Sequence, residues 1–506
     1  MFGYYSLVLE GGRYFGNVSL NELHVFECDG DHCLLDVRNH AIHRISPHLA
    51  SLVGRLAFDP ACLVAENDMQ ELLDRNLVLL PENNSPVAKE GSEDAREASW
   101  EESLFSVNSL ILFLCQECNL RCIYCFADGG SYTGAGKMSA ETAFRAIDWL
   151  IENSKAERKL DICLFGGEPL LNFPVVRKAV SYAREQAALH GKEVVFTITT
   201  NGSLLDDEVI AFLRDEKIEP IISVDGPPEY QNRQRPFKNG AGSYDRIAAN
   251  IRRLLDVIPD AKARATVYGD ADPSVMLRGL EQMGFDEGIL VRAAPPLFNT
   301  GSFLPETTEE ESMLRMVAFH REEIDRFLQA VRSRSLDKSS PPLILSSFAG
   351  IATPEKCLYG CVIGKRRLVV TVNGDIYPCA CLVGQDEARM GNIADYKADD
   401  PNEYYRAVVD TLPACRGCWA RYLCGGGCFY RNKARTGDMH RPGEIDCTER
   451  KKSYEMLIHA YCQLDDSDRA YLSDILTVPE NSNNWVSRRK HPVTLKPVHG
   501  LRFQSA

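Results

Sequence analysis

The sequence predicts an α/β protein centred on a partial (β/α)6 barrel, with a smaller α+β region before the barrel and a cysteine-rich region after it. Two observations predict this arrangement. Short apolar segments alternate with helical patterns through the middle of the chain, and cysteines gather where that alternation begins and again near the C-terminus. Strand-helix alternation is typical of parallel strands joined by crossover helices.

The composition is that of a globular protein with several domains. The chain has 506 residues, of which 44% are hydrophobic and 25% charged, and about two to four domains are expected at this length. The net charge of -14 disfavours binding to nucleic acid. Because the sequence offers neither a signal-peptide pattern nor a long apolar stretch, we expect a cytoplasmic protein without a membrane partner.

The N-terminal region, residues 1–83, has the pattern of a small winged-helix-like α+β domain. Apolar alternation in ELHVFEC and HCLLDVRNHAIHRI predicts antiparallel strands, and MQELLDRN predicts a helix. Residues 84–104 are polar and acidic and show neither helical nor strand periodicity, so they are expected to be a linker.

Residues 105–340 carry the predicted TIM-like partial barrel. Its strands are expected in the apolar runs SLILFL, LDICLF, VVFTIT, PIISV, KARATVY and GILVRA. In such barrels the chemistry lies at the carboxyl ends of the strands. The first of these strands leads directly into the first group of cysteines.

Eighteen cysteines indicate metal or cluster ligation, because disulfides are rare in a reducing cytosol. One group is Cys118, Cys122 and Cys125. The second group lies in residues 341–450, where apolar content is low and bound metal would have to supply folding free energy. It consists of Cys357, Cys361, Cys379, Cys415, Cys418, Cys424, Cys428 and Cys447. The other seven are expected to be small buried hydrophobic residues, and residues 451–506 to form a helix and a tail.

The first group has the spacing C-x3-C-x2-C. Three thiolates can hold three irons of a four-iron cluster and leave the fourth iron open to a substrate or cofactor. A structural zinc site is the alternative, but no His or Cys follows at finger-like spacing.

The stretch CNLRCIYC, Cys118 to Cys125, resembles the signature of radical S-adenosylmethionine (SAM) enzymes. Three further motifs follow successive predicted strands in that family's order: FGGEP from Phe165, TTNG from Thr199 and SVDG from Ser223. Each alone is usually a turn, but together they are specific. The resemblance implies that SAM binds the open iron of a [4Fe–4S] cluster and is cleaved by one electron to a 5'-deoxyadenosyl radical, which abstracts hydrogen from the substrate.

The resemblance also implies which residues contact SAM. Gly166 and Gly167 would let the backbone approach the methionine, and Glu168 would accept hydrogen bonds from its amino group. The remaining four implied contacts are Ser223 and Arg235 to the ribose and carboxylate, Arg264 as a second carboxylate partner, and Tyr124 shielding the cluster near the adenine. The sequence assigns no general acid or base.

The second group resembles the SPASM domain of radical SAM enzymes, which implies two auxiliary clusters and a total of three [4Fe–4S] clusters. The implied ligands of the nearer auxiliary cluster are Cys357, Cys361, Cys379 and Cys428, and those of the farther one are Cys415, Cys418, Cys424 and Cys447. Many relatives lack a match to Cys357 and leave that iron open, and Cys381 is an alternative ligand. A zinc ribbon would use only four of these thiolates.

Members with a SPASM domain mostly act on peptides or proteins. Sulfatase-maturing members carry an Asp base where this sequence has Ala380, which counts against that activity. The N-terminal region resembles elements that bind a leader peptide as an added strand, although an unrelated docking domain remains an alternative. The glycine-rich insertion after Cys125 and the following MSAETAFRAIDWLI resemble maturases that install thioether bridges in cysteine-rich peptides, the ranthipeptide and six-cysteine-peptide group.

The predicted function is therefore thioether formation in a ribosomally made precursor peptide, with electrons from a flavodoxin or ferredoxin. Within this class, a maturase that makes carbon-carbon links or epimerises residues is the alternative. From another class, an iron-sulfur electron-transfer or redox-sensing protein would need no SAM pocket, so formation of 5'-deoxyadenosine distinguishes the two.

Overall fold

The structure is a computed structural model. It describes residues 5–8, 14–20, 22–58, 64–79, 107–132, 134–155, 157–286, 288–293, 297, 308–336, 344–353, 355–361, 364, 366–396, 407–476 and 498–499. The predicted linker at residues 84–104 lies outside this set.

A nine-stranded sheet forms the centre of the molecule, with the order β12-β11-β10-β9-β8-β7-β13-β14-β15. Six neighbouring strands are parallel and follow one another in chain order, as the sequence predicts for a partial (β/α)6 barrel. They are β7 (Ser109–Cys115), β8 (Lys159–Gly166), β9 (Glu193–Thr200), β10 (Ile218–Ser223), β11 (Lys262–Val267) and β12 (Gly288–Arg292). The strands make an open array whose carboxyl ends share one edge.

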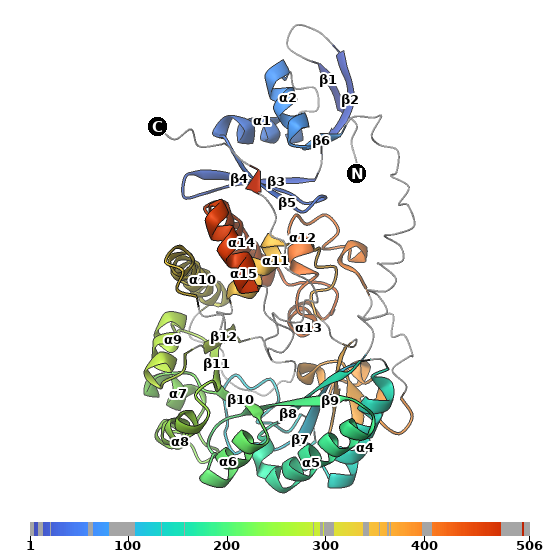
Figure 1. The fold of residues 1–506 in the computed structure, drawn as a ribbon, viewed down its shortest axis with the longest axis vertical. Coiled ribbons are helices and arrows are strands. Elements are labelled where there is room, and N and C mark those ends of the chain that lie inside the picture. Colours follow the sequence, from blue (N-terminus) through green and yellow to red (C-terminus); the bar gives the residue numbers. More distant parts are fainter. Residues whose placement is uncertain are drawn as a thin grey trace.

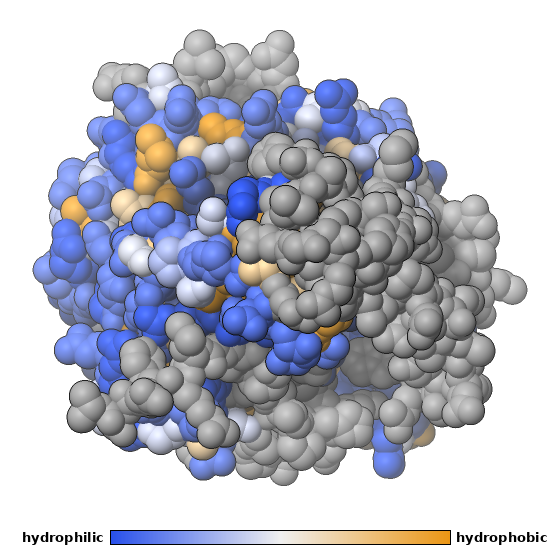
Figure 2. Space-filling view, turned by 90° about the horizontal axis from the view of Figure 1, so that it is seen from above, coloured by the Kyte–Doolittle hydropathy of each residue, from blue (hydrophilic) through white to orange (hydrophobic). Residues whose placement is uncertain are grey.

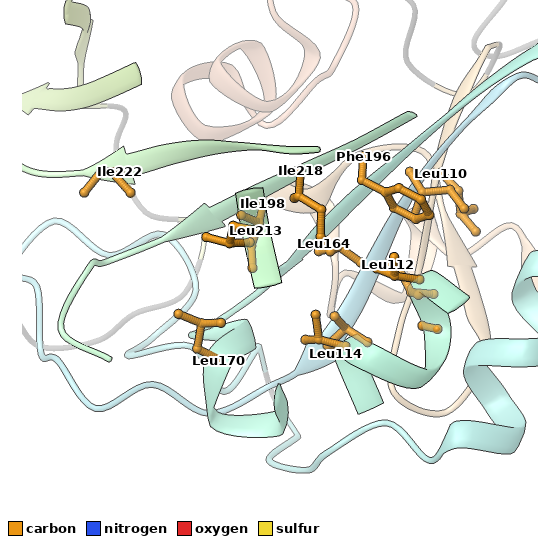
Figure 3. Close-up of a cluster of buried hydrophobic side chains, with 14 of the residues drawn as sticks. Leu110, Leu112, Leu114, Leu164, Leu170, Phe196, Ile198, Leu213, Ile218 and Ile222 are labelled. Atoms are coloured by element: carbon orange, nitrogen blue, oxygen red, sulfur yellow. The ribbon is translucent and has the colours of Figure 1, made fainter. Parts of the chain in front are cut away.

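Helices between the strands cover one side of this sheet (Figure 1). They are α4 (Ala140–Asn153), α5 (Phe173–Leu189), α6 (Asp207–Asp215), α7 (Pro228–Gln234), α8 (Tyr244–Val257) and α9 (Pro273–Gln282), with the short 3-10 helix η2 (Pro169–Asn172) before α5. Leu112, Leu164 and Ile198 from neighbouring strands gather in the core beneath them (Figure 3). Burial of these side chains stabilises the barrel, since Leu→Ala in a core costs about 2–5 kcal/mol.

The cysteine-rich region continues the barrel sheet. Strand β13 (Arg367–Val370) pairs parallel with β7, and β14 (Asp375–Tyr377) and β15 (Gly391–Asn392) follow antiparallel. The region's other elements are η3 (Ala380–Leu382), η4 (Asp386–Ala388), η6 (Val409–Thr411), α12 (Arg421–Cys424) and α13 (Phe429–Thr436). Cys379 and Cys428 of the second cysteine group pack against a core that contains Phe113 of the first barrel strand.

The N-terminal region contains the predicted antiparallel strands β3 (Leu23–Cys28), β4 (Asp31–Asp36) and β5 (Ala41–Ile45). The helices α1 (Pro47–Phe58) and α2 (Glu66–Asp74) follow. A separate small sheet joins β1 (Tyr5–Val8), β2 (Tyr14–Leu20) and β6 (Val78–Leu79), and β16 (Val498–His499) adds to β5. The helix predicted from MQELLDRN overlaps α2.

Both faces of the β3–β5 sheet are buried. Successive residues of a strand face opposite sides, so Leu34 packs in the core under α1 and α2 while Cys33 and Leu35 pack on the other side. That second core is shared with four helices that lie between the N-terminal region and the barrel (Figure 1). They are α10 (Glu309–Arg332), α11 (Ile344–Ala352), α14 (Glu444–Cys462) and α15 (Asp466–Leu476). Residues 22–45 therefore form part of the C-terminal core.

Seen from the N-terminal end, the described surface is largely hydrophilic, with apolar residues in small separate groups (Figure 2). Among the helices that the structure describes, none combines the length and apolar character needed to cross a bilayer.

Candidate active site

The loop after β7 presents the first cysteine group at the carboxyl edge of the barrel. Its backbone is held by the last residue of α7 and by the segment that follows it. The Arg121 N–H donates to the Pro236 carbonyl (2.8 Å), and the Ile123 N–H donates to the Gln234 carbonyl (2.9 Å). These two backbone hydrogen bonds hold the loop in place.

The three thiols of this loop converge. Burial and the Glu168 carboxylate raise the pKa of the Cys118 thiol to about 11, and the Cys125 thiolate adds to the rise. Burial also raises the pKa of Cys122, with contributions from the Cys125 and Cys118 thiolates. Such thiols favour the protonated form unless a cation replaces the protons. Three converging soft sulfur donors fit an iron-sulfur cluster with one iron left unligated by protein.

Gly166 and Gly167 are required by the neighbouring backbone. Gly166 has φ of 136°, and a Cβ there would collide with the Cys115 carbonyl oxygen. A Cβ on Gly167 would collide with the Glu117 carbonyl oxygen, and Gly130 of the glycine-rich insertion packs against Gly167. The sequence suggested approach to a methionine as the reason for these glycines, but the structure supplies a reason within the protein: the end of β8 lies against the start of the cysteine loop.

Alanine at Gly166 is expected to abolish cluster assembly at Cys118, Cys122 and Cys125, because the added Cβ forces β8 and the loop apart. Iron content after anaerobic reconstitution measures this. Gly191→Ala is the matched control, since Gly191 also has positive φ (64°) but open space where the Cβ would lie. Equal iron content in the two variants would contradict the argument.

Glu168 is fully buried and links two of the motifs. Its carboxylate accepts hydrogen bonds from Thr200 Oγ1 (2.8 Å) and from the backbone N–H groups of Asn201 (2.8 Å) and Leu170 (3.1 Å). Burial raises the pKa of Glu168 to about 7, against the opposing effect of these hydrogen bonds. A carboxylate has about four acceptor positions, so the three protein donors orient Glu168 and leave capacity for one more donor, such as an ammonium group.

A polar network supports Cys118. Asn201 Nδ2 lies 3.7 Å from Cys118 Sγ as a donor and donates to Asn119 Oδ1 (2.9 Å). Asn119 in turn donates to Ser203 Oγ (2.8 Å). Hydrogen bonds to ligand sulfur stabilise the thiolate and tune a cluster's potential. The sequence did not assign a role to Asn201, although it lies in the TTNG motif.

Asp225 holds two of the predicted SAM contacts together. It is fully buried, accepts a hydrogen bond from Tyr124 Oη (2.5 Å) and forms an ion pair with Arg235 Nε (3.0 Å). The Arg235 guanidinium lies over the Tyr124 ring at 5.2 Å. Burial disfavours the charge of Arg235, but the Asp225 carboxylate outweighs it and raises the pKa. The sequence assigned no role to Asp225, and its only signal was its place in SVDG.

Replacing Asp225 with Asn is expected to destabilise the protein by about 3–5 kcal/mol, because Arg235 would remain buried without a counter-charge. Urea unfolding measures this loss. The control is Asp270→Asn, which breaks the half-exposed Arg233–Asp270 pair and should cost about 0–1 kcal/mol. Similar unfolding midpoints for both variants would contradict the prediction.

Ser223 and Arg264 are brought together across the sheet. Ser223 ends β10 and is paired with Arg264 of β11. The Arg264 side chain lies on the exposed side of its strand and close to Cys381. Five of the seven predicted SAM contacts thus lie at or just after the carboxyl ends of β7, β8 and β10, whereas Arg235 follows α7 and Arg264 lies within β11.

Four cysteines of the second group lie close enough together to interact electrostatically. Burial and the thiolates of three neighbours raise the pKa of Cys415 to about 12; these neighbours are Cys424, Cys447 and Cys418. Arg450 Nη1 donates to Cys424 Sγ (3.1 Å), which places a positive charge beside this group.

The other four cysteines of the second group do not all share the same surroundings. Cys379 and Cys428 pack against a core that contains Phe113 and Tyr430. The Cys357 N–H donates to the Tyr422 carbonyl (2.8 Å). Burial raises the pKa of Tyr454, and the thiolates of Cys424 and Cys357 raise it further, so Cys357 lies on the same side as Cys424. Cys361 is exposed.

Comparison with known proteins relates the barrel to a known family. Residues 112–272 match the family described as the radical SAM superfamily. The chain is 34% identical over 134 residues to the uncharacterized protein MJ0907 of Methanocaldococcus jannaschii, a match over 26% of this chain and 44% of that protein's length. It is 21% identical over 361 residues to a cysteine-type anaerobic sulfatase-maturating enzyme of Clostridium perfringens, covering 68% of this chain and 90% of the relative.

Among solved structures, native anSMEcpe with bound AdoMet superposes with a TM-score of 0.58 and 19% identity, over 70% of this chain and 99% of that one. This likeness agrees with the partial-barrel fold. The chain therefore contains a radical SAM domain and is related to the anaerobic sulfatase-maturating enzymes. The family implies SAM and a [4Fe–4S] cluster as cofactors.

Proposed function

We propose that this protein is a radical SAM maturase that joins a Cys sulfur to a carbon of the same precursor peptide. The observation that carries the proposal is the placing of two cysteine groups around one core. Cys125 from the SAM-cluster loop and Cys379 and Cys428 from the second group all pack against the core that contains Phe113, Tyr132 and Tyr430. The two proposed clusters would therefore lie near one another, so that a peptide bound beside them would face both.

The residues of the barrel have defined roles in this proposal. SAM bound to the open iron would supply a 5'-deoxyadenosyl radical able to remove a hydrogen atom from a peptide carbon. Cys118, Cys122 and Cys125 would hold that cluster, Glu168 would bind the amino group of SAM, and Arg235 with Tyr124 would be kept in place by Asp225. Ser223 and Arg264 remain proposed contacts to the ribose and carboxylate.

Thioether formation needs an acceptor for one electron. The peptide carbon gives up a hydrogen atom, the peptide thiol gives up a proton, and the new C–S bond leaves one electron over. A nearer auxiliary cluster at Cys379 and Cys428 would accept this electron or bind the peptide thiolate. The farther cluster, at the group around Cys415, would stabilise a region with little apolar core of its own, and a flavodoxin or ferredoxin would supply electrons to the SAM cluster.

The substrate is proposed to be a cysteine-rich precursor peptide whose leader adds as a strand to the N-terminal sheet in the cytoplasm. A two-residue segment, β16, pairs in parallel with β5 at one edge of that sheet, which supports addition of an extended leader strand there in place of β16. Ala380, at the place of the sulfatase maturases' Asp base, supports a peptide substrate other than a sulfatase.

Co-expression with a short cysteine-rich peptide encoded beside the gene tests the proposal. A thioether removes two hydrogens per bridge and makes one Cys resistant to iodoacetamide. Mass spectrometry with alkylation reads both changes. Loss of two hydrogens with every Cys still alkylated would indicate a carbon-carbon link. An unchanged peptide mass in water, together with uptake of deuterium at Cα in deuterated water, would indicate epimerisation. Either result would refute thioether formation.

A further inference from the structure

Cys381 lies two residues after the proposed cluster ligand Cys379, and one short turn holds the two together. The 3-10 helix η3 follows Cys379, whose Sγ accepts a hydrogen bond from the Cys381 backbone N–H (3.4 Å). The Leu382 N–H donates to the Cys379 carbonyl (3.0 Å). The turn therefore fixes the backbone of both cysteines on the side of the barrel sheet where β13 and β14 lie.

The Cys381 side chain shares its surroundings with two proposed ligands. Cys379, Cys381 and Cys428 all pack against the core that contains Tyr430. The electrostatics give the same neighbours: the hydrogen bond to Cys379 and burial raise the pKa of Cys381, and the Cys428 thiolate raises it further. The pKa of Tyr430 is raised by burial and next by these three sulfur atoms. Three thiols thus gather near Tyr430.

Cys357 lies toward the farther group. Its backbone N–H is bonded to Tyr422, in the helix that ends at Cys424, and Tyr454 has Cys424, Cys357 and Cys418 around it. The residue before Cys361 contacts the loop that leads to Cys428: the Gly360 N–H donates to the Gly425 carbonyl (2.6 Å). This hydrogen bond places the backbone at Cys361 beside that loop.

We propose that Cys381 supplies a thiolate ligand to the nearer auxiliary cluster, together with Cys361, Cys379 and Cys428, in the place that the sequence assigned to Cys357. The inference rests on the proposed auxiliary clusters. Soft sulfur donors gathered in a partly buried site suit iron-sulfur ligation. With Cys381 as a ligand, the nearer cluster is closed to direct binding by the peptide thiol and serves as the electron acceptor of the reaction.

The test compares full-length, anaerobically reconstituted wild type with Cys381→Ala and Cys357→Ala, and with Cys163→Ala as the control, because Cys163 lies in barrel strand β8. Iron and sulfide per chain, EPR spectra of the reduced protein and alkylation of each Cys by iodoacetamide are measured. We expect about twelve irons in wild type and the control. Cys381→Ala should lower this to about eight or convert one cluster to a three-iron form, and Cys357→Ala should leave iron and EPR unchanged.

Alkylation gives an independent readout. Cys381 should be protected from iodoacetamide in the reconstituted protein and become reactive once the iron is removed by a chelator under denaturing conditions. A Cys381→Ala variant with wild-type iron, sulfide and EPR would overturn the inference, as would alkylation of Cys381 in the intact protein. Only about four irons in wild type would overturn the auxiliary clusters themselves, and with them the proposed electron acceptor.

Discussion

Alanine at Cys118, Cys122 and Cys125 together is expected to remove one cluster and abolish SAM cleavage, with a loss of activity larger than for any other substitution considered. The three thiols are the sulfur donors of the loop after β7, and they converge there under burial. Removing them leaves no ligand set for an iron that SAM could bind. Iron per chain should fall by about four, and the EPR change that SAM induces in the reduced wild type should disappear.

The second cysteine group provides the internal control for the triple variant. Its farther four lie together around Cys415, far along the chain from the substituted loop, so their EPR signal should persist. Cys28→Ala is a control for the loss of a partly exposed thiol outside both groups. Loss of all iron from the triple variant would contradict independent cluster sites.

Deletion of residues 1–83 is expected to give aggregated protein. The sequence predicts this region as a separate domain, which would predict a soluble remainder. In the structure, however, Cys33, Leu35 and Ile42 are almost fully buried in a core shared with Phe348 and Tyr461 of the C-terminal helices. Their removal would expose the apolar face of these helices to water, at a free-energy cost of about 25 cal/mol per Å² of exposed apolar surface.

Size-exclusion chromatography of the truncated protein measures the outcome. A milder variant, His48→Ala, changes an exposed residue of α1 that contacts Asp68 and should remain soluble with full iron content. A monomeric truncated protein with wild-type iron would show that residues 1–83 are an independent unit.

The barrel was predictable from sequence because its signals are local. Each strand is a short apolar run bounded by turn residues, and each motif lies at the end of its strand, as with FGGEP, whose first two residues end β8. The parallel order then follows from the helices between the strands. The antiparallel strands β3, β4 and β5 were predictable for the same reason, since alternation marks them within a few residues.

Features that depend on distant segments were not predictable. The pairing of β13 with β7 joins residues more than 250 positions apart, and no local pattern records it. In the sequence, Asp225 is only a residue of the SVDG motif. Its role depends on Arg235 and Tyr124, which the fold brings into contact with it. The reason for Gly166 likewise required the position of the Cys115 carbonyl. Periodicity reports burial, whereas these features depend on which backbone passes nearby.

The most direct test of the central claim is SAM cleavage by the protein itself. Reconstituted wild type reduced with dithionite should convert SAM to 5'-deoxyadenosine and methionine, measured by liquid chromatography and mass spectrometry, and the triple alanine variant should not. If a protein with a full complement of iron forms no 5'-deoxyadenosine above the level of that variant, the three-cysteine loop does not present an open iron to SAM.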